Sequence, residues 1–133
     1  MTAQTRGVAK VLVVDDSAMS RRILRRILDD AGHTVVEAAD GASALASYEL
    51  ERPALVTLDL IMTGMDGLQV LIELRRQHPH ARVIIATADL QRATRDEVMA
   101  AGACAVVNKP FSPEEVIRAV DSALAESTGI RPL

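Results

Sequence analysis

The chain is poor in aromatic residues and in cysteine. Among 133 residues there is no Trp, and Tyr48 and Phe111 are the only two aromatic side chains. Proteins that bind single-stranded nucleic acid commonly stack bases on aromatic platforms, so the composition disfavours that function. The single cysteine, Cys104, excludes an internal disulfide and a zinc site made of cysteines. A protein without disulfides is most simply assigned to a reducing compartment.

The chain also lacks a basic excess and long apolar segments. Its formal net charge is -3, whereas binding to a phosphate backbone needs clustered positive charge. No apolar run approaches the roughly 20 residues that span a bilayer, and the first ten residues, "MTAQTRGVAK", contain no apolar signal-peptide core. We therefore expect a cytoplasmic protein that binds neither nucleic acid directly nor membrane.

Length and composition predict one soluble globular domain, because 133 residues suffice for a single sizeable core and 49% of them are hydrophobic. Continuous apolar runs are typical of parallel strands that are covered on both faces. Four such runs occur, with a shorter and more polar fifth that suits a sheet edge: 11–14, 54–58, 82–87 and 104–107, and then 34–38. Segments of helical period separate and follow them. The pattern predicts an α/β fold, (βα) repeated five times, with a doubly wound parallel sheet.

Polar residues follow these runs at the ends where ligands bind in open α/β sheets. They are Asp15 and Asp16 after the first run, Asp59 after the third, Thr87 at the end of the fourth, and Asn108 and Lys109 after the fifth. Crowded carboxylates repel one another unless a cation is present. Oxygen ligands without His or Cys favour Mg²⁺ over zinc.

This residue set is suited to phosphoryl chemistry. Mg²⁺ and Lys109 would neutralise phosphoryl oxygens, and the hydroxyl of Thr87 would donate a hydrogen bond. Asp59 is the candidate nucleophile because it ends a central strand. Each residue also has a plainer interpretation: Asp15 or Asp16 could cap the following helix, Thr87 could be an ordinary strand residue, and Lys109 a solvated charge. Their convergence favours the site.

Four segments carry a resemblance to a known family: "VLVVDDSAMSRRIL", "LDLIMTGMDGL", "VIIATA" and "NKPF". In this order and spacing the chain resembles the receiver domains of two-component response regulators, the CheY-like proteins. The resemblance covers about residues 9–126, with residues 1–8 and 127–133 as tails. It implies a flavodoxin-like, five-stranded parallel sheet in the order 2-1-3-4-5.

The resemblance also implies roles for the site residues. Asp59 would be the phospho-acceptor. Asp16, Asp59 and the backbone carbonyl of Ile61 would bind Mg²⁺ directly, with Asp15 acting mainly through water. Lys109 would pair with the acceptor and then with its phosphoryl group, and Thr87 would move toward that group. A cis peptide bond would precede the proline of "NKPF".

By the same resemblance the chain is a single-domain signalling module and catalyses only its own phosphorylation and dephosphorylation. A histidine kinase or phosphotransfer protein would donate the phosphoryl group, and an unidentified protein would receive the signal, in chemotaxis or another phosphorelay. A nucleotide or flavin binder is disfavoured, because the first strand ends on Asp15 and Asp16 and no Gly-rich turn follows it. Two alternatives stay open: a receiver excised from a longer regulator, and a haloacid dehalogenase-type phosphatase. The last needs an acid where this chain has Ile61.

Two positions depart from the family pattern. Thr63 stands where receivers usually have Pro, which predicts a more mobile loop after the acceptor. Val106 stands where receivers usually have a switching Tyr or Phe, which weakens the expected coupling to an output face. Elsewhere, a run of basic residues from Arg21 to Arg26 marks either a solvated helix face or a docking surface, and the three histidines, His33, His78 and His80, are predicted at the surface.

Overall fold

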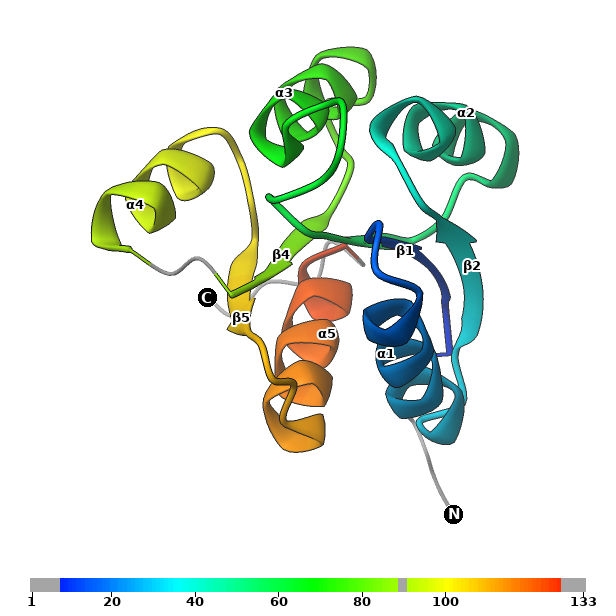
Figure 1. The fold of residues 1–133 in the computed structure, drawn as a ribbon. Helices are drawn as coiled ribbons and strands as arrows, with labels where there is room; N and C mark the ends of the chain where they lie inside the picture. Colours follow the sequence, from blue (N-terminus) through cyan, green and yellow to red (C-terminus); the bar gives the residue numbers. More distant parts are fainter. Residues whose placement is uncertain (1–7, 89–90, 128–133) are drawn as a thin grey trace, which may run out of the picture.

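The computed structural model describes residues 8–88 and 91–127. Strands and helices alternate along the chain (Figure 1), with these bounds: β1 Lys10–Val14, α1 Ala18–Asp30, β2 Thr34–Ala38, α2 Gly41–Glu51, β3 Leu55–Leu58, α3 Gly67–Gln77, β4 Val83–Thr87, α4 Arg92–Ala100, β5 Ala105–Asn108 and α5 Pro113–Ser127. Each predicted strand is present, with its ends displaced by at most one residue. Continuous apolar runs thus located the strands well.

The five strands form one parallel sheet in the order β2-β1-β3-β4-β5. This order confirms the predicted fold, including the edge position of the more polar strand β2. Strand β3 lies between β1 and β4, and Val14 pairs with Leu58 while Leu58 pairs with Ile85. Because the strands are parallel and in this register, the residues that follow β1, β3 and β5 emerge at one edge of the sheet.

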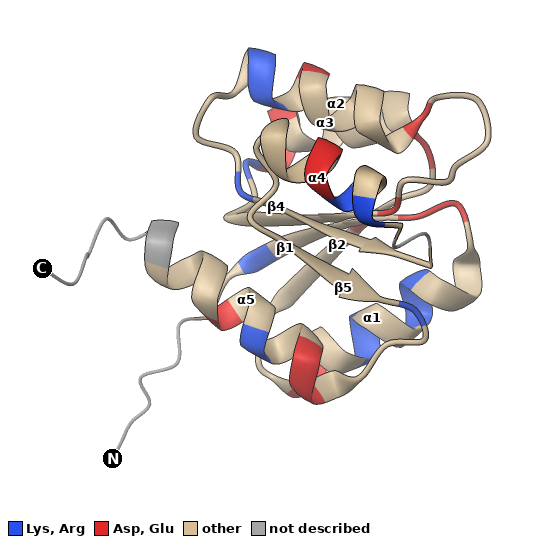
Figure 2. Cartoon of the chain, turned by 90° about the vertical axis from the view of Figure 1, so that its left-hand side faces the viewer, with Lys and Arg blue, Asp and Glu red and all other residues tan. Residues whose placement is uncertain are grey.

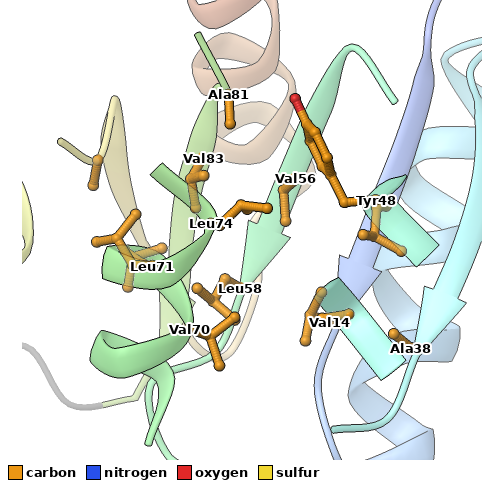
Figure 3. Close-up of a cluster of buried hydrophobic side chains, with 14 of the residues drawn as sticks. Val14, Ala38, Tyr48, Val56, Leu58, Val70, Leu71, Leu74, Ala81 and Val83 are labelled. Atoms are coloured by element: carbon orange, nitrogen blue, oxygen red, sulfur yellow. The ribbon is translucent and has the colours of Figure 1, made fainter. Parts of the chain in front are cut away.

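Helices cover both faces of the sheet (Figure 1): α2, α3 and α4 lie on one side, and α1 and α5 on the other. Each interface is an aliphatic core. Leu58, Leu71 and Tyr48 belong to the first (Figure 3), and Leu24, Ile84 and Val120 to the second. Burial of both sheet faces explains why the strands read as continuous rather than alternating apolar runs.

The predictions made for the chain ends and for the histidines have mixed outcomes. Most of the predicted tails, 1–8 and 127–133, lies outside the described residues, and α5 extends to Ser127. Within 8–88 and 91–127, no helix is long and apolar enough to cross a bilayer. The surface prediction is wrong for His33, which is 4% exposed and whose Nδ1 accepts a hydrogen bond from the N–H of Ala9 over 3.1 Å.

For His78, at the end of α3, the surface prediction holds only in part, because its side chain is 13% exposed. The imidazole lies against the ring of Tyr48, with centroids 4.6 Å apart, and its Nε2 lies 3.2 Å from Oε1 of Glu49. Both contacts come from α2, which is distant from His78 in the sequence. Local sequence therefore could not reveal them.

Candidate functional site

The turn after β1 presents two carboxylates in different environments. Asp15 is 1% exposed, and its Oδ1 accepts a hydrogen bond from the N–H of Ser17 over 2.9 Å. Asp16 is exposed. Neither caps α1: the cap is Ser17, whose hydroxyl accepts a hydrogen bond from the N–H of Ser20. The helix-cap alternative for Asp15 and Asp16 is therefore wrong, and both side chains are available to the site.

Arg21 fixes this turn from the first turn of α1. Its Nη1 donates to the backbone oxygen of Asp15 over 2.7 Å, and its Nε donates to Oε1 of Glu37 on β2 over 2.9 Å. The sequence shows only a basic run at this place, and no local pattern indicates the specific contact of Arg21. A guanidinium anchored at both ends restrains the backbone that carries Asp15 and Asp16.

Asp59 directly follows the central strand β3 and is 5% exposed. Its N–H donates to the oxygen of Val14 over 3.0 Å, which ties the strand end to β1. Its Oδ1 accepts a hydrogen bond from the N–H of Ile61 over 3.2 Å. Ile61 itself is 63% exposed at the mouth of the site. The carboxylate is thus held in place but is reachable from the loop side.

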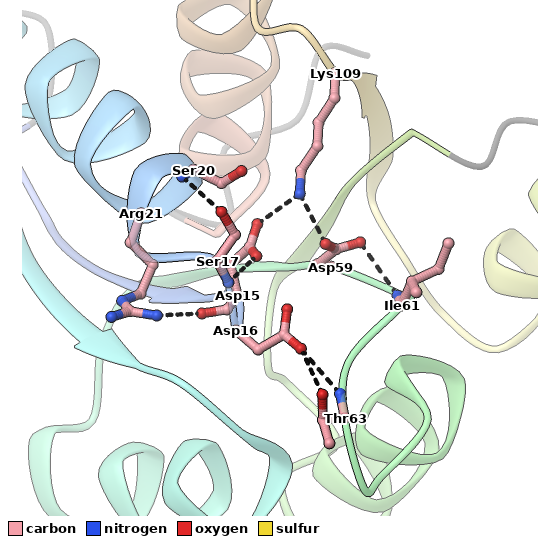
Figure 4. Close-up of polar contacts among 9 residues, drawn as sticks. All are labelled: Asp15, Asp16, Ser17, Ser20, Arg21, Asp59, Ile61, Thr63 and Lys109. Carbon is pink, nitrogen blue, oxygen red and sulfur yellow. Dashed lines mark hydrogen bonds and ion pairs between the residues drawn. The ribbon is translucent and has the colours of Figure 1, made fainter.

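Lys109 joins the two buried carboxylates (Figure 4). Its Nζ lies 2.8 Å from Oδ2 of Asp59 and 2.9 Å from Oδ2 of Asp15. Burial alone would lower the pKa of Lys109, but hydrogen bonds to Asp59 and Asp15, together with their charges, raise it above its ordinary value. Lys109 is therefore a cation throughout the neutral range. The Lys109–Pro110 peptide bond is cis.

Thr87 ends β4 beside this group and is fully buried. Its backbone oxygen accepts a hydrogen bond from the N–H of Lys109 over 3.1 Å, so the two residues share one strand end. Since Leu58 pairs with Ile85, Thr87 stands one residue farther along the sheet than the level of Asp59. The structure therefore brings Asp15, Asp59, Thr87 and Lys109 to one edge, while their chemical roles remain predictions.

Asp16 has a partner that the sequence analysis missed. Its Oδ2 accepts two hydrogen bonds from Thr63, from the backbone N–H over 3.0 Å and from the hydroxyl over 3.1 Å. The two residues are 47 positions apart, and no sequence signal connected them. The position that departs from the family pattern thus makes a specific contact with a predicted metal ligand, where a proline could not donate its nitrogen.

The donor chemistry of this edge fits Mg²⁺. The candidate ligands are carboxylate and carbonyl oxygens, and Figure 2 shows acidic loop segments at the ends of the strands. In the described part of the chain, no three or more His, Cys, Asp or Glu side chains are grouped as a metal cage. Mg²⁺ sites seldom need such a cage, because the ion keeps several waters and binds through one or two carboxylates. Asp16 and Asp59, with the carbonyl of Ile61, could hold it in that way.

Comparisons with known proteins agree with this geometry. The family described as "Response regulator receiver domain" matches residues 11–121. The chemotaxis protein CheY of Thermotoga maritima is 36% identical over 84% of this chain and 94% of its own length. A probable transcriptional regulator, ycf27 of Porphyridium aerugineum, is 41% identical over 86% of this chain but only 50% of its own length.

Solved structures show the same likeness. The chemotaxis protein CheY4 of Vibrio cholerae matches with a TM-score of 0.83 and 32% identity, over 89% of this chain and all of that one. Sequence, strand order and the placement of the polar residues thus lead to one assignment. The chain belongs to the family of response regulator receiver domains.

Proposed function

We propose that Asp59 accepts a phosphoryl group from a histidine kinase or phosphotransfer protein in a Mg²⁺-dependent reaction, and that the modification switches a protein-binding surface. Receiver domains are signalling modules rather than ordinary enzymes. The observation that carries the proposal is the buried Asp59 at the central strand end, paired with Lys109 over 2.8 Å. A buried carboxylate with a shared cation is suited to reversible addition of charge.

The transfer needs few chemical groups. An oxygen of Asp59 bonds to phosphorus while the P–N bond of the donor phosphohistidine breaks, and the electron pair of that bond returns to the imidazole nitrogen. No proton moves at Asp59. Catalysis is then positioning and charge neutralisation. Lys109, held by both Asp15 and Asp59, supplies one positive charge, and the buried hydroxyl of Thr87 supplies a hydrogen-bond donor.

Mg²⁺, when bound, neutralises phosphoryl oxygens and the crowded carboxylates. Asp16, Asp59 and the carbonyl of Ile61 would hold it, and Asp15 would act through water. Asp15 is already placed for an indirect role, because its two oxygens are engaged by Ser17 and Lys109. The apolar side chain of Ile61, 63% exposed beside Asp59, would limit the approach of water to the acyl phosphate and so would prolong the phosphorylated state.

The surface beside the site suits a donor protein. A groove of about 470 Å³ runs between α1 and the start of α5. Its lining is mostly apolar and includes Ile23, Ile27 and Phe111, with Arg26 and Asp30 as its charged residues. Met19, on the same helix and 69% exposed, extends the apolar area. Of the basic run, Arg21 and Arg25 pair with Glu37, whereas Arg22 and Arg26 are exposed. An apolar groove with exposed arginine side chains on the same helix is a suitable docking surface for a phosphohistidine-bearing helix.

The output would pass through the surface around α4 and β5. Val106 lies there, partly buried against the core beneath α3 and α4. Because valine cannot swing a ring between two positions, movement at Thr87 would reach this surface by small shifts in packing. We therefore propose a weaker coupling than an aromatic switch would give, or an output surface elsewhere. The partner proteins, rather than the receiver domain itself, decide whether the chain serves chemotaxis or another phosphorelay.

Two alternatives differ in their support. A haloacid dehalogenase-type phosphatase would need a general acid at the position of Ile61, whose side chain is apolar and 63% exposed. A receiver within a longer regulator is compatible with the match to half of ycf27, and its chemistry at Asp59 would be the same. The cytoplasmic location stays a prediction.

The proposal is tested by intact mass after incubation with a small-molecule phosphodonor, with and without Mg²⁺. The wild type should gain one phosphoryl group only with Mg²⁺, and Asp59→Asn should gain none. Asp66→Asn is the matched control, because Asp66 lies in the same loop and caps α3 through the N–H of Leu68, a role that asparagine also fills. It should behave as the wild type. Equal gain in Asp59→Asn, or no gain in any protein, would contradict the proposal.

A further inference from the structure

Thr63, in the loop after β3, holds the exposed carboxylate of Asp16. Its N–H and its hydroxyl both donate to Oδ2 of Asp16, over 3.0 Å and 3.1 Å. Figure 4 shows the second oxygen of Asp16 on the side of Asp15 and Asp59. Thr63 therefore occupies one oxygen and leaves the other directed at the buried carboxylates.

This arrangement couples two loops. Asp16 belongs to the turn after β1, and Thr63 to the loop between β3 and α3. That loop also contains Ile61, whose N–H is bonded to Asp59. The contact of Thr63 with Asp16 thus sets the distance between the candidate ligands of the β1 turn and those of the β3 loop. An exposed aspartate has several rotamers, and two convergent donors restrict it to one.

We propose that Thr63 is a positioning residue for the Mg²⁺ site, acting through Asp16. The inference rests on the Mg²⁺ dependence in the proposed function. Groups that hydrogen-bond a metal-ligating carboxylate orient it, and their loss commonly lowers metal affinity by about 10- to 100-fold. Here the hydroxyl is one of two donors, and the backbone N–H remains in any variant other than proline. We therefore expect removal of the hydroxyl to weaken Mg²⁺ binding by about 5- to 10-fold.

The test is titration of ¹⁵N-labelled protein with Mg²⁺, followed through the backbone amide signals of the loop, in the absence of any phosphodonor. Thr63→Val keeps the shape and the backbone donor but removes the hydroxyl. Thr63→Ser restores the hydroxyl and should bind as the wild type. Thr34→Val, on an exposed position of β2, is the matched control and should also bind as the wild type.

Two further measurements separate positioning from a general structural role. Urea unfolding in EDTA should give the same transition midpoint for Thr63→Val and the wild type, as for most surface substitutions. In an Asp16→Asn background, Thr63→Val should cause no further loss of Mg²⁺ affinity, because the residue through which it acts is already altered.

The inference is overturned if Thr63→Val binds Mg²⁺ as tightly as the wild type or more tightly, or if its effect persists undiminished in the Asp16→Asn background. Its failure is distinct from failure of the proposed function. A wild type that accepts a phosphoryl group only with Mg²⁺, together with an unaffected Thr63→Val, would refute the role of Thr63 alone. A wild type whose signals do not respond to Mg²⁺ would refute both.

Discussion

Lys109 is the residue on which the charge balance of the site depends. Its ammonium faces Asp15 and Asp59, which are 1% and 5% exposed. Two buried carboxylates without a cation would repel each other and lack solvation. The same ammonium is the candidate partner of the phosphoryl group, so stability and function share one residue.

Lys109→Met should therefore lower the free energy of unfolding at pH 7 by about 2 kcal/mol in EDTA, since a charged hydrogen-bonding group is removed from buried partners. The pKa of Lys109 is raised from 10.5 in the folded protein. Its charge therefore stabilises the fold fully below about pH 10.5, and this stabilisation disappears as the pH rises through the raised pKa. Urea unfolding should show a constant difference between the two proteins from neutral pH to about pH 9 and a shrinking one above pH 10.5. No difference at pH 7 would contradict this account.

At the scale of elements, β2 and α1 are joined by a cluster of charges. Glu37 on β2 accepts hydrogen bonds from Arg21 and Arg25 of α1. Burial alone would raise the pKa of Glu37, but the hydrogen bonds from Arg25 and Arg21 and their charges lower it. The cluster also positions the site, since Arg21 holds the backbone oxygen of Asp15.

Glu37→Gln should lower the free energy of unfolding at pH 7 by about 0.5 to 1 kcal/mol, the range measured for well-formed surface ion pairs. In the folded protein the pKa of Glu37 lies below the ordinary 4.5. The ion pairs of Glu37 therefore stabilise the fold fully above about pH 4.5, and this stabilisation is lost as the pH falls through the lowered pKa. Chemical denaturation as a function of pH measures it. Glu97→Gln, on an exposed position of α4, should show little difference at any pH. A deficit for Glu37→Gln that stays constant down to pH 2 would argue against the ion pairs as its cause.

The start of α3 is packed directly on the strand end that carries the candidate acceptor. A Cβ on Gly67 would lie 2.3 Å from the backbone oxygen of Asp59 and 2.4 Å from Cα of Leu60. These are backbone atoms and cannot rotate away. Glycine at this position therefore permits the close approach of α3 to Asp59.

Gly67→Ala should lower the free energy of unfolding by about 3 kcal/mol, at the upper end of overpacking costs, and should slow phosphoryl acceptance because Asp59 is displaced. Gly64→Ala is the control in the same loop. A Cβ there meets nothing within 4 Å, although φ is +90°, so the backbone conformation alone should cost about 1 to 2 kcal/mol. Thermal unfolding and intact-mass time courses measure both effects. Equal stability of the two variants would refute the steric explanation.

Across the whole molecule, the features that depend on the order and direction of the strands could be predicted from the sequence. Parallel strands with short apolar runs place Asp59 and Lys109 at one edge, and the structure shows their side chains paired. Burial of both sheet faces made the strand positions readable to within one residue. The prediction of a looser loop at Thr63 considered backbone freedom alone and did not foresee its two hydrogen bonds to Asp16.

Contacts between distant loops and helices could not be predicted. Thr63 meets Asp16 only because two loops converge, and His78 meets Tyr48 only because α2 packs on α3. His33 is buried through its contact with Ala9, before β1. Such contacts depend on loop paths and side-chain rotamers, for which a single sequence carries no periodic signal.

The most direct test of the central claim is to locate the phosphoryl group. After treatment with a phosphodonor and Mg²⁺, borohydride reduces an aspartyl phosphate to homoserine, and peptide mass spectrometry identifies the converted residue. The account predicts homoserine at position 59 and nowhere else, dependent on both the donor and Mg²⁺. Conversion at Asp15, Asp16 or Asp66, or a phosphoryl group found on serine or threonine, would contradict it.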